Sequence, residues 1–406
     1  MTRGLAIADA IVGVGAIVKF WRGLSELECL EAPRASTTQP TVALLVPLLD
    51  ERAYVESIVS NLLSLDYDTS LLRVVLITSE VEGDGNDSTH AVCRRAIESS
   101  NARNIVLLHA PVGSPQRKAT QLNFALEHLA AQPPDWVGVY DADSTPDPRS
   151  LTELAARARV EPWVQVFQQS PIYLNRWTER DRWMRAEAVL QSARSLCVEA
   201  PRIRRSGSKQ SPGYYYLIGH GQFFKYDLIA KCRFPVEPVI DDLPLGKALA
   251  AANIPAGALS TRDFCTVPTQ VSTFVRQSEI WFAGHIDLRS VRRTRETLDG
   301  TSRLPFKVVA GALSDVVPWA ARLPHLVLTA LASVPPRGSL IRLLRHLGVL
   351  TLETYLEHRV VRRVGQPIPG WRPTWVLRPA VKSLGALTCL ARAFIGRPTL
   401  LQKTPR

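Results

Sequence analysis

Cysteine is scarce in this sequence, and the few cysteines form no arrangement that indicates a metal site or a disulfide framework. Six cysteines are scattered over 406 residues, and no two of them form a C-x-x-C pair, which excludes a zinc knuckle. The spacing also argues against a disulfide-stabilised secreted domain. We therefore expect the reducing cytosol to be the compartment of this chain.

Long uncharged apolar runs are missing as well. A membrane-spanning helix requires roughly 18 or more consecutive apolar residues, and the apolar run at 5–20 is interrupted by Asp9. No cationic segment with a small-residue cleavage site frames that run, so we expect no signal peptide. Residues 1–35 are instead expected to form an apolar helix that serves as a membrane anchor.

The composition is that of a globular protein with a basic C-terminal quarter. Hydrophobic residues make up 46% and charged residues 21% of the chain, which excludes a disordered polymer and a coiled coil. The formal net charge is +12, and residues 301–406 hold 16 basic against 3 acidic residues. Such a basic excess is typical of proteins that bind nucleic acid, anionic membranes or phosphorylated substrates.

Between residues 41 and 169 the sequence repeats one pattern: an apolar run, a polar turn and a segment with helical periodicity. This alternation is typical of parallel β-α-β units. Strands are predicted at 42–46, 74–78, 105–109, 136–140 and 164–168, and helices at 55–65, 89–99, 119–129 and 151–158. The fold class is therefore α/β with a mostly parallel sheet, and ligands of such sheets bind at the carboxyl ends of the strands.

The rest of the chain is predicted to be mainly helical. We expect helices at 177–198, 243–252 and 274–288, a loop at 202–213 and a strand at 214–224. From residue 304 onward, apolar segments that carry Arg are broken by prolines. This composition is typical of helices that lie in a bilayer interface; the alternative is a soluble helical domain with a solvated basic face. We accordingly divide the chain into 1–35, a sheet domain at 36–300, and a basic, membrane-associating helical region at 301–406.

The most informative polar residues directly follow the strand at 136–140. Asp141 and Asp143 are separated by one residue, which puts two carboxylates on one tight turn at the ligand-binding edge of the sheet. Hard oxygen ligands of this kind, completed by the oxygens of a diphosphate, suit Mg²⁺ or Mn²⁺, and the ion offsets charge that develops on a departing phosphate. Taken alone, a D-x-D sequence is more typical of an ordinary acidic turn after a strand.

Further segments, in their order along the chain, resemble the motifs of family 2 glycosyltransferases, whose GT-A domain binds a nucleotide-sugar. Residues 46–51 (VPLLDE) resemble V-P-x-x-N-E with Asp50 in place of Asn. Residues 117–123 (RKATQLN) resemble G-K-x-x-x-L-N with Arg117 in place of Gly, and 169–171 (QSP) are similar to the Q-T-P of glycan synthases. Asp141 and Asp143 match the D-x-D of the family. The resemblance covers residues 41–288 and points to the branch of the cellulose and hyaluronan synthases.

The second half of the sheet domain contains two more such segments. Residues 219–225 (GHGQFFK) resemble the Gly-rich acceptor-side segment of the family, and 241–246 (DDLPLG) resemble E-D-x-x-L-G with Asp241 in place of Glu. The resemblance makes Asp242 the general base, which takes the proton of the acceptor hydroxyl as this hydroxyl attacks the anomeric carbon in an inverting transfer. The alternative for this pair is N-terminal capping of the helix that follows.

Residues 277–281 (QSEIW) are similar to the Q-x-x-R-W element of processive glycan synthases, but Ile280 stands where Arg is usual. In those synthases the Arg stabilises the diphosphate leaving group, so either Arg276 takes its place here or the enzyme works without it. Trp281 can stack on an acceptor sugar or pack in the core. The missing Arg favours transfer of a single sugar over processive polymerisation.

The acid that binds the uridine is the least defined contact. Glu80 follows the second predicted strand and is the best positional match, with Asp84 and Asp87 as alternatives. His220 lies between two glycines and can either contact the acceptor or have a structural role. The resemblance implies donor or acceptor contacts at Pro47, Asp50, Glu51, Glu80, Lys118, Asn123, Asp141, Gln169, Gly219, His220, Gly221, Asp241, Arg276, Gln277 and Trp281.

The resemblance as a whole implies an inverting, metal-dependent hexosyltransferase with Mn²⁺ or Mg²⁺ as cofactor. Its donor is expected to be a UDP-sugar, and its acceptor a saccharide or a lipid-linked sugar. Residues 396–406 are similar to the W-x-K-T-x-R terminus of many such enzymes, and we expect the chain at the cytoplasmic face of the cell membrane, bound to its anionic surface. Two other functions stay open: a sugar-phosphate nucleotidylyltransferase, against which the missing G-x-G-T-R loop argues, and a basic nucleic-acid-binding protein. We expect no nucleic acid as a partner.

Overall fold

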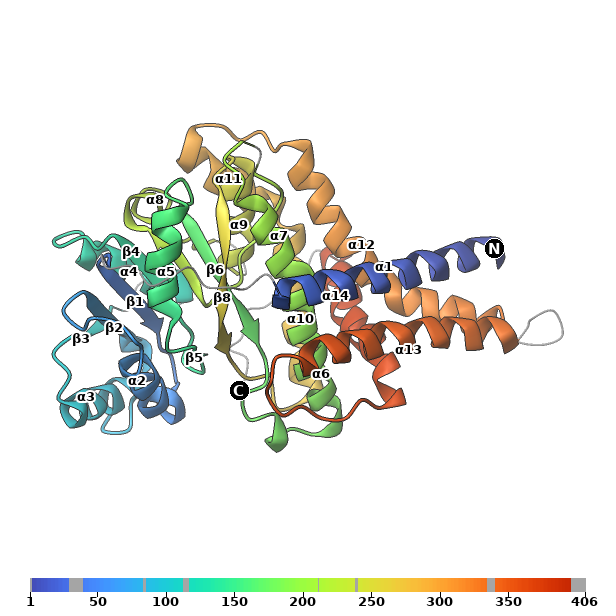
Figure 1. Cartoon of the computed structure of the whole chain (residues 1–406), viewed down its shortest axis with the longest axis horizontal. Helices are drawn as coiled ribbons and strands as arrows, with labels where there is room; N and C mark the ends of the chain where they lie inside the picture. The colour runs from blue at the N-terminus through green and yellow to red at the C-terminus, as the bar shows by residue number, and fades with distance from the viewer. Residues whose placement is uncertain are drawn as a thin grey trace.

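The computed structural model describes residues 2–28, 39–82, 85–111, 117–210, 212–237, 240–333 and 340–395. A sheet covered by helices forms one part of the molecule (Figure 1). A helical arm made of α1 (Thr2–Glu28), α12 (Phe306–Leu331) and α13 (Leu340–Arg362) extends away from that sheet. The five cysteines in the described residues are buried. Cys29 and the terminal segment 396–406 lie outside the described residues.

The sheet has eight strands in the order β3-β2-β1-β4-β7-β6-β8-β5. Strand β1 pairs in parallel with β2 and β4, and β6 pairs in parallel with β8, whereas β7 and β5 run antiparallel to their neighbours. The predicted mostly parallel α/β sheet and its five predicted strands are therefore confirmed. The strands span Val42–Pro47 (β1), Leu72–Ser79 (β2), Ile105–Ala110 (β3), Trp136–Val139 (β4), Thr145–Pro146 (β5), Val166–Ile172 (β6), Gln222–Lys225 (β7) and Ala256–Phe264 (β8).

Two strands were missed, and one predicted strand is shorter than expected. The sequence of β8 contains Arg262 and Asp263, which hide the apolar pattern of a strand, and β5 has only two residues. The strand predicted at 214–224 begins only at Gln222. It is preceded by a turn in which Gly221 adopts a φ of 64°, a conformation that glycine reaches without strain.

Strand β1 is apolar throughout because helices cover both faces of the sheet. Ala43 and Leu45 pack in the core that contains α4 (Lys118–Leu129) and α9 (Asp242–Ala251). Leu44 and Val46 pack in the core that contains α2 (Val55–Leu63) and α5 (Ser150–Val160). Alternate side chains of a strand point to opposite faces, so a doubly covered strand reads as one apolar run. Helices α3 (Thr89–Ser100), α8 (Tyr226–Cys232) and α11 (Leu288–Asp299) complete the cover.

The helices beyond β6 differ from the prediction in two places. Helix α6 (Arg182–Arg194) continues through a π-helical turn (Ser195–Glu199) into α7 (Ala200–Ser206), so the loop predicted from residue 202 is wrong up to residue 206. Arg202 and Arg204, which suggested a solvated loop, instead pair with Asp315 and Glu26. The first apolar segments after residue 304, which prolines were expected to break, form the single helix α12 with Pro318 and Pro324 inside it. The remaining helices are α10 (Val271–Ile286) and α14 (Arg378–Phe394).

Helix α1 is the apolar N-terminal helix that was expected. The segment at 4–28 is long and apolar enough to cross a membrane by length and composition alone, and most of it is not buried. Asp9 does not break this helix, because it is buried against α13, with its carboxylate 2.7 Å from His346 Nδ1 and 3.1 Å from Arg345 NH2. A second ion pair joins Lys19 to Glu353 at 2.9 Å. The N-terminal helix therefore packs on the C-terminal region.

Candidate active site

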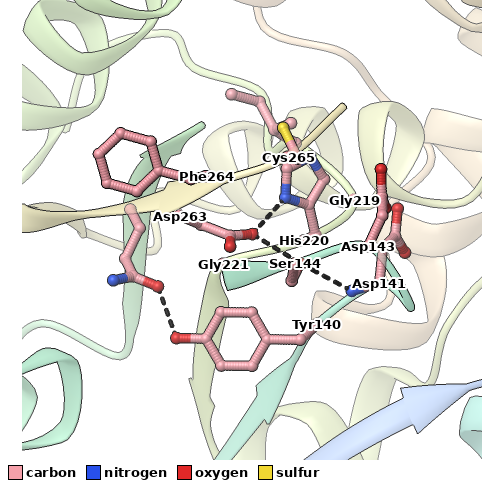
Figure 2. A network of polar contacts seen from close by, with 12 residues as sticks. Tyr140, Asp141, Asp143, Ser144, Gly219, His220, Gly221, Asp263, Phe264 and Cys265 are labelled. Carbon is pink, nitrogen blue, oxygen red and sulfur yellow. Dashed lines mark hydrogen bonds and ion pairs between the residues drawn. The ribbon is translucent and has the colours of Figure 1, made fainter. Parts of the chain in front are cut away.

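The D-x-D turn lies where β4 ends, as predicted, and is held by neighbouring side chains (Figure 2). Lys118, the first residue of α4, places its Nζ 2.6 Å from Asp141 Oδ1 and donates to the carbonyl oxygen of Gly219 at 2.5 Å. Asp143 Oδ2 accepts from the hydroxyl and the backbone N–H of Thr266, at 2.5 and 3.1 Å. Both carboxylates line a cavity of about 240 Å³.

Asp242 lies at the same cavity, at the start of α9. A Cβ atom at Gly219 would lie 3.1 Å from Asp242 Oδ2 and 3.3 Å from Lys118 Nζ, so any larger residue would require these two side chains to shift. The capping alternative is not supported for Asp241, whose side chain makes no capping hydrogen bond. Asp242 Oδ1 accepts from the N–H of Leu243 at 2.8 Å, which orients the carboxylate.

Burial and the mutual repulsion of the acids change their protonation. Burial, followed by the charge of Asp241, raises the pKa of Asp242 from an ordinary 3.8 to about 7. Burial also raises the pKa of Asp241. Burial acts to lower the pKa of Lys118, but Asp141 and Asp241 outweigh it and raise that pKa. A carboxyl group with a pKa close to neutral suits general-base catalysis near that pH.

A buried polar network supports the turn from below (Figure 2). His220 Nδ1 lies 2.6 Å from Asp263 Oδ2, and Ser144 Oγ donates to the same oxygen at 2.8 Å. Ser144 in turn accepts from the N–H of Asp141 at 3.2 Å. Burial acts to lower the pKa of His220, but the hydrogen bond to Asp263 and the negative charges of Asp263 and Asp141 together outweigh burial and raise that pKa. Asp263 was missed because its strand, β8, was not recognised.

Nine of the predicted site residues line the cavity together, although they come from distant parts of the sequence. Within the described residues, Asp241 Oδ2 and Gln277 Oε1 are buried there without a hydrogen-bond partner, which is typical of atoms that bind a ligand. The nine residues are Lys118, Asp141, Asp143, Gly219, His220, Asp241, Asp242, Gln277 and Trp281.

Four other predicted residues lie near the carboxyl ends of β1 and β2 but do not line this cavity. Asp50 has a φ of 51°, a conformation that Asn and Asp tolerate better than most residues, which explains why Asp can replace the usual Asn. Its N–H donates to Glu82, while Glu51 N–H donates to Thr89. Pro47 ends β1, and Glu80 is exposed after β2. Asp87 is also exposed, and Asp84 lies outside the described residues.

The last four predicted residues also do not line the cavity. Asn123 exchanges two hydrogen bonds with the backbone of Phe234. Gln169 is fully buried, accepts from Tyr140 and donates to Ser150. Gly221 makes the turn before β7, with its N–H bonded to Val139. Arg276 is half-buried on α10.

Residues that the sequence analysis did not select complete the cavity from the helical part of the chain. Helix α6 and the π-helical turn contribute Gln191, Arg194 and Glu199, and α12 and α14 contribute Trp319 and Lys382. The cavity therefore crosses the boundary expected at residue 301. Tyr173, Tyr216, His285 and Thr266 also line it.

The donor set fits a hard divalent cation. Five carboxylates line the cavity together with three basic side chains, those of Lys118, Arg194 and Lys382. The five are Asp141, Asp143, Glu199, Asp241 and Asp242. Carboxylate oxygens are the ligands that Mg²⁺ and Mn²⁺ prefer, and the excess of negative charge favours a cation there.

A family model described as "Glycosyltransferase like family 2" matches residues 40–242, half of the chain. The chain belongs to glycosyltransferase family 2. It is therefore a glycosyltransferase, an enzyme that transfers a sugar from a nucleotide-sugar donor, and the nucleotidylyltransferase and nucleic-acid-binding alternatives fall away.

Among solved structures, a mannosyltransferase shows the same fold. The mannosyltransferase PcManGT from Pyrobaculum calidifontis, in complex with GDP-Man and Mn²⁺, has a TM-score of 0.60 at 19% identity, with 95% of this chain and 99% of that chain covered. S. aureus TarS 1–349 has a TM-score of 0.42 at 13% identity, with 88% and 92% covered. The first likeness shows the GT-A fold followed by C-terminal helices. No curated protein sequence matches this glycosyltransferase significantly.

Proposed function

We propose that this glycosyltransferase is an inverting hexosyltransferase that moves one sugar from a nucleoside diphosphate-sugar to an acceptor hydroxyl. The single observation that carries the proposal is the cavity that joins Asp141 and Asp143 to Asp242, a carboxyl group with a pKa of about 7. The D-x-D pair and the base thus have access to the same bound substrates. A UDP-sugar is the expected donor.

The D-x-D pair, Lys118 and Asp242 have separate roles in this proposal. Asp141 and Asp143 hold Mn²⁺ or Mg²⁺, which when bound offsets the charge of the departing diphosphate. Lys118, adjacent to Asp141, contacts the diphosphate oxygens through a charge-assisted hydrogen bond. Asp242 accepts the proton of the acceptor hydroxyl while the hydroxyl oxygen bonds to the anomeric carbon and the diphosphate leaves from the opposite side.

Nucleotide binding is the first experiment. Calorimetry with UDP and with GDP, each with and without Mn²⁺, is expected to show Mn²⁺-dependent binding of one nucleotide to the wild type. The variant Asp141→Asn with Asp143→Asn is expected to lose it. A matched control is Asp66→Asn with Asp227→Asn, which makes the same charge change at two exposed residues away from the cavity. The proposed site is contradicted if the wild type binds neither nucleotide, or if the D-x-D variant binds nucleotide as tightly as the wild type does.

The base is tested separately with Asp242→Asn. Removing a general base slows transfer by about 10²–10⁴-fold, and nucleotide binding should be retained because Asp242 does not contact the donor in this scheme. Product release is measured as free nucleoside diphosphate in the presence of acceptor. Full activity in this variant is incompatible with the proposed role.

We also propose a place near the cellulose and hyaluronan synthases, with single rather than processive transfer to a saccharide or lipid-linked acceptor. The similarity of residues 169–171 and 277–281 to the synthase elements supports the branch. Ile280 supports single transfer, since it is buried and stands where those synthases have Arg.

We propose that the arm associates with the cytoplasmic face of a membrane. Ile7, Ile11, Val14, Val18 and Trp21 recur at helical spacing on α1 and are between 39% and 67% exposed. Further apolar side chains are exposed on α12 and α13, Leu331 and Ile341 among them. Apolar faces of this kind enter the acyl boundary of a bilayer.

Vesicle flotation tests the arm. The wild type is expected to float with phosphatidylglycerol vesicles, and Ile11→Lys with Val14→Lys is expected to reduce the bound fraction at least tenfold. Val81→Lys with Val106→Lys is the control, because both valines are exposed on the sheet domain. Equal flotation of the two double variants argues against binding through α1.

A further inference from the structure

Lys382 is a buried cation on the wall of the cavity. Its residue is 7% exposed, and α14 brings it to the cavity from a position 140 residues beyond Asp242. Its Nζ makes one long hydrogen bond, 3.3 Å, to the amide oxygen of Gln191. No ion pair to Lys382 occurs within the described residues.

The charges around Lys382 do not balance. Two arginines and two glutamates lie close to it, but they are matched with each other: Arg378 pairs with Glu187, and Arg194 with Glu199 at 3.0 Å. A positive charge on Lys382 would therefore be uncompensated in a buried place, which is costly unless an anion binds beside it. Burial, followed by Arg194 and Arg378, holds the pKa of Lys382 well below its usual range.

Aromatic ring faces surround the same ammonium group. Its Nζ lies 4.4 Å from the centroid of Trp319 and 5.5 Å from that of Trp281, and both side chains line the cavity. Cation–π contacts partly stabilise the charge but do not replace an anion. Flat indole faces also pack on the apolar face of a sugar ring.

We propose that Lys382, Trp281 and Trp319 form an acceptor subsite for a sugar that carries a phosphate group, with the phosphate bound by the ammonium group of Lys382. The inference rests on the proposed function, because it assigns the acceptor that Asp242 deprotonates. The diphosphate of the donor belongs at Lys118 and the D-x-D turn. Lys382 is therefore left for a second anion, which comes either from a soluble sugar phosphate or from a phosphate-linked lipid.

The subsite is tested by binding rather than by turnover. With the donor site filled by its nucleoside diphosphate and Mn²⁺, wild type is expected to bind glucose 1-phosphate at least tenfold more tightly than glucose, about 1.4 kcal/mol. Lys382→Met should abolish this difference, and Lys382→Arg should retain it because the charge is kept. Equal binding of both sugars to the wild type, or an undiminished preference in Lys382→Met, overturns the proposal.

Lys247→Met is the matched control. Lys247 is also fully buried, but its Nζ donates to the backbone oxygens of His285 and Gly284, and it does not line the cavity. This variant should keep the phosphate preference, and its loss there contradicts the assignment. Thermal unfolding checks that both variants are folded; if Lys382→Met is unfolded, Lys382→Gln is measured instead.

Two further readouts separate the possible outcomes. Nucleoside diphosphate binding in Lys382→Met should equal that of wild type; a tenfold loss there assigns Lys382 to the leaving group and overturns the acceptor role. If the wild type binds no nucleotide, the proposed function itself is refuted. The preference for glucose 1-phosphate over glucose can still be measured in that case, so the two failures are distinguishable. Dodecyl phosphate that binds to wild type more tightly than glucose 1-phosphate identifies a lipid source, and the reverse order a soluble one.

Discussion

Replacing Asp242 with Asn is expected to stabilise the fold while it removes activity. The pKa of this carboxyl group is raised from 3.8 to about 7, mainly by burial, so the ionised form is disfavoured in the folded state. One pKa unit corresponds to about 1.4 kcal/mol, which gives an upper limit of about 4 kcal/mol for the destabilisation by ionised Asp242. Because Asp242 is half-buried, we expect about 1–3 kcal/mol.

Because the pKa of Asp242 is raised, the stability gained by Asp242→Asn depends on pH in a defined direction. A carboxyl group with a raised folded-state pKa is not penalised below its unfolded value near 4, and stability is lost as the pH rises through about 7. The advantage of Asp242→Asn over wild type should therefore be small near pH 4, grow up to pH 7 and stay constant above. The amide oxygen can still accept from the N–H of Leu243, as Oδ1 does at 2.8 Å.

Urea unfolding at pH 5 and pH 8, with EDTA to remove metal ions, measures this gain. Asp87→Asn is the control, since Asp87 is exposed and surface substitutions usually change stability by less than about 0.5 kcal/mol. An Asp242→Asn variant that is less stable than wild type at pH 8, or whose advantage is equal at the two pH values, refutes the electrostatic argument.

Three further substitutions test how the site and the arm are held. Thr266→Val removes the hydroxyl that orients Asp143 at 2.5 Å and should weaken Mn²⁺ binding about tenfold; unchanged affinity in calorimetry contradicts this. Asp263→Asn leaves buried His220 without its carboxylate partner and should cost about 3 kcal/mol at pH 6 in urea unfolding, whereas an unchanged midpoint is evidence against the network. Asp9→Asn should loosen α1 and speed the hydrogen exchange of its backbone amides at least tenfold, because Arg345 loses its ion pair. Equal exchange rates in the variant and the wild type argue against a role of this ion pair in holding α1.

Local patterns predicted the sheet domain well, because the information lies close together in the sequence. Strands β1, β2 and β4 are apolar runs that are almost entirely buried, and β3 is an apolar run at the edge of the sheet. The positions of all four follow from periodicity alone. Asp141 and Asp143 follow directly from the end of β4. Lys118 was found through its segment, and the structure brings it to within 2.6 Å of Asp141.

The rest of the cavity depends on contacts between distant residues, which no local pattern encodes. Lys382 and Trp319 belong to segments with the composition of surface helices, and only the packing of α14 on α10 and α12 turns them toward the cavity. Asp263 lies on a strand whose sequence is not apolar. Asp9 interrupts an apolar run in the sequence, but in the structure it is neutralised by a helix more than 330 positions away.

The same long-range pairing explains the uneven distribution of charge along the sequence. Acidic residues of the first 300 positions pair with basic residues of the last 106: Asp9 with Arg345, and Glu279 with Arg392 at 3.0 Å. Part of the basic excess is therefore neutralised inside the molecule and is not available to a nucleic acid. These pairs hold α13 and α14 against the rest of the chain, and α14 in turn brings Lys382 to the cavity. The C-terminal charge thus contributes to the architecture of the site as well as to the surface of the arm.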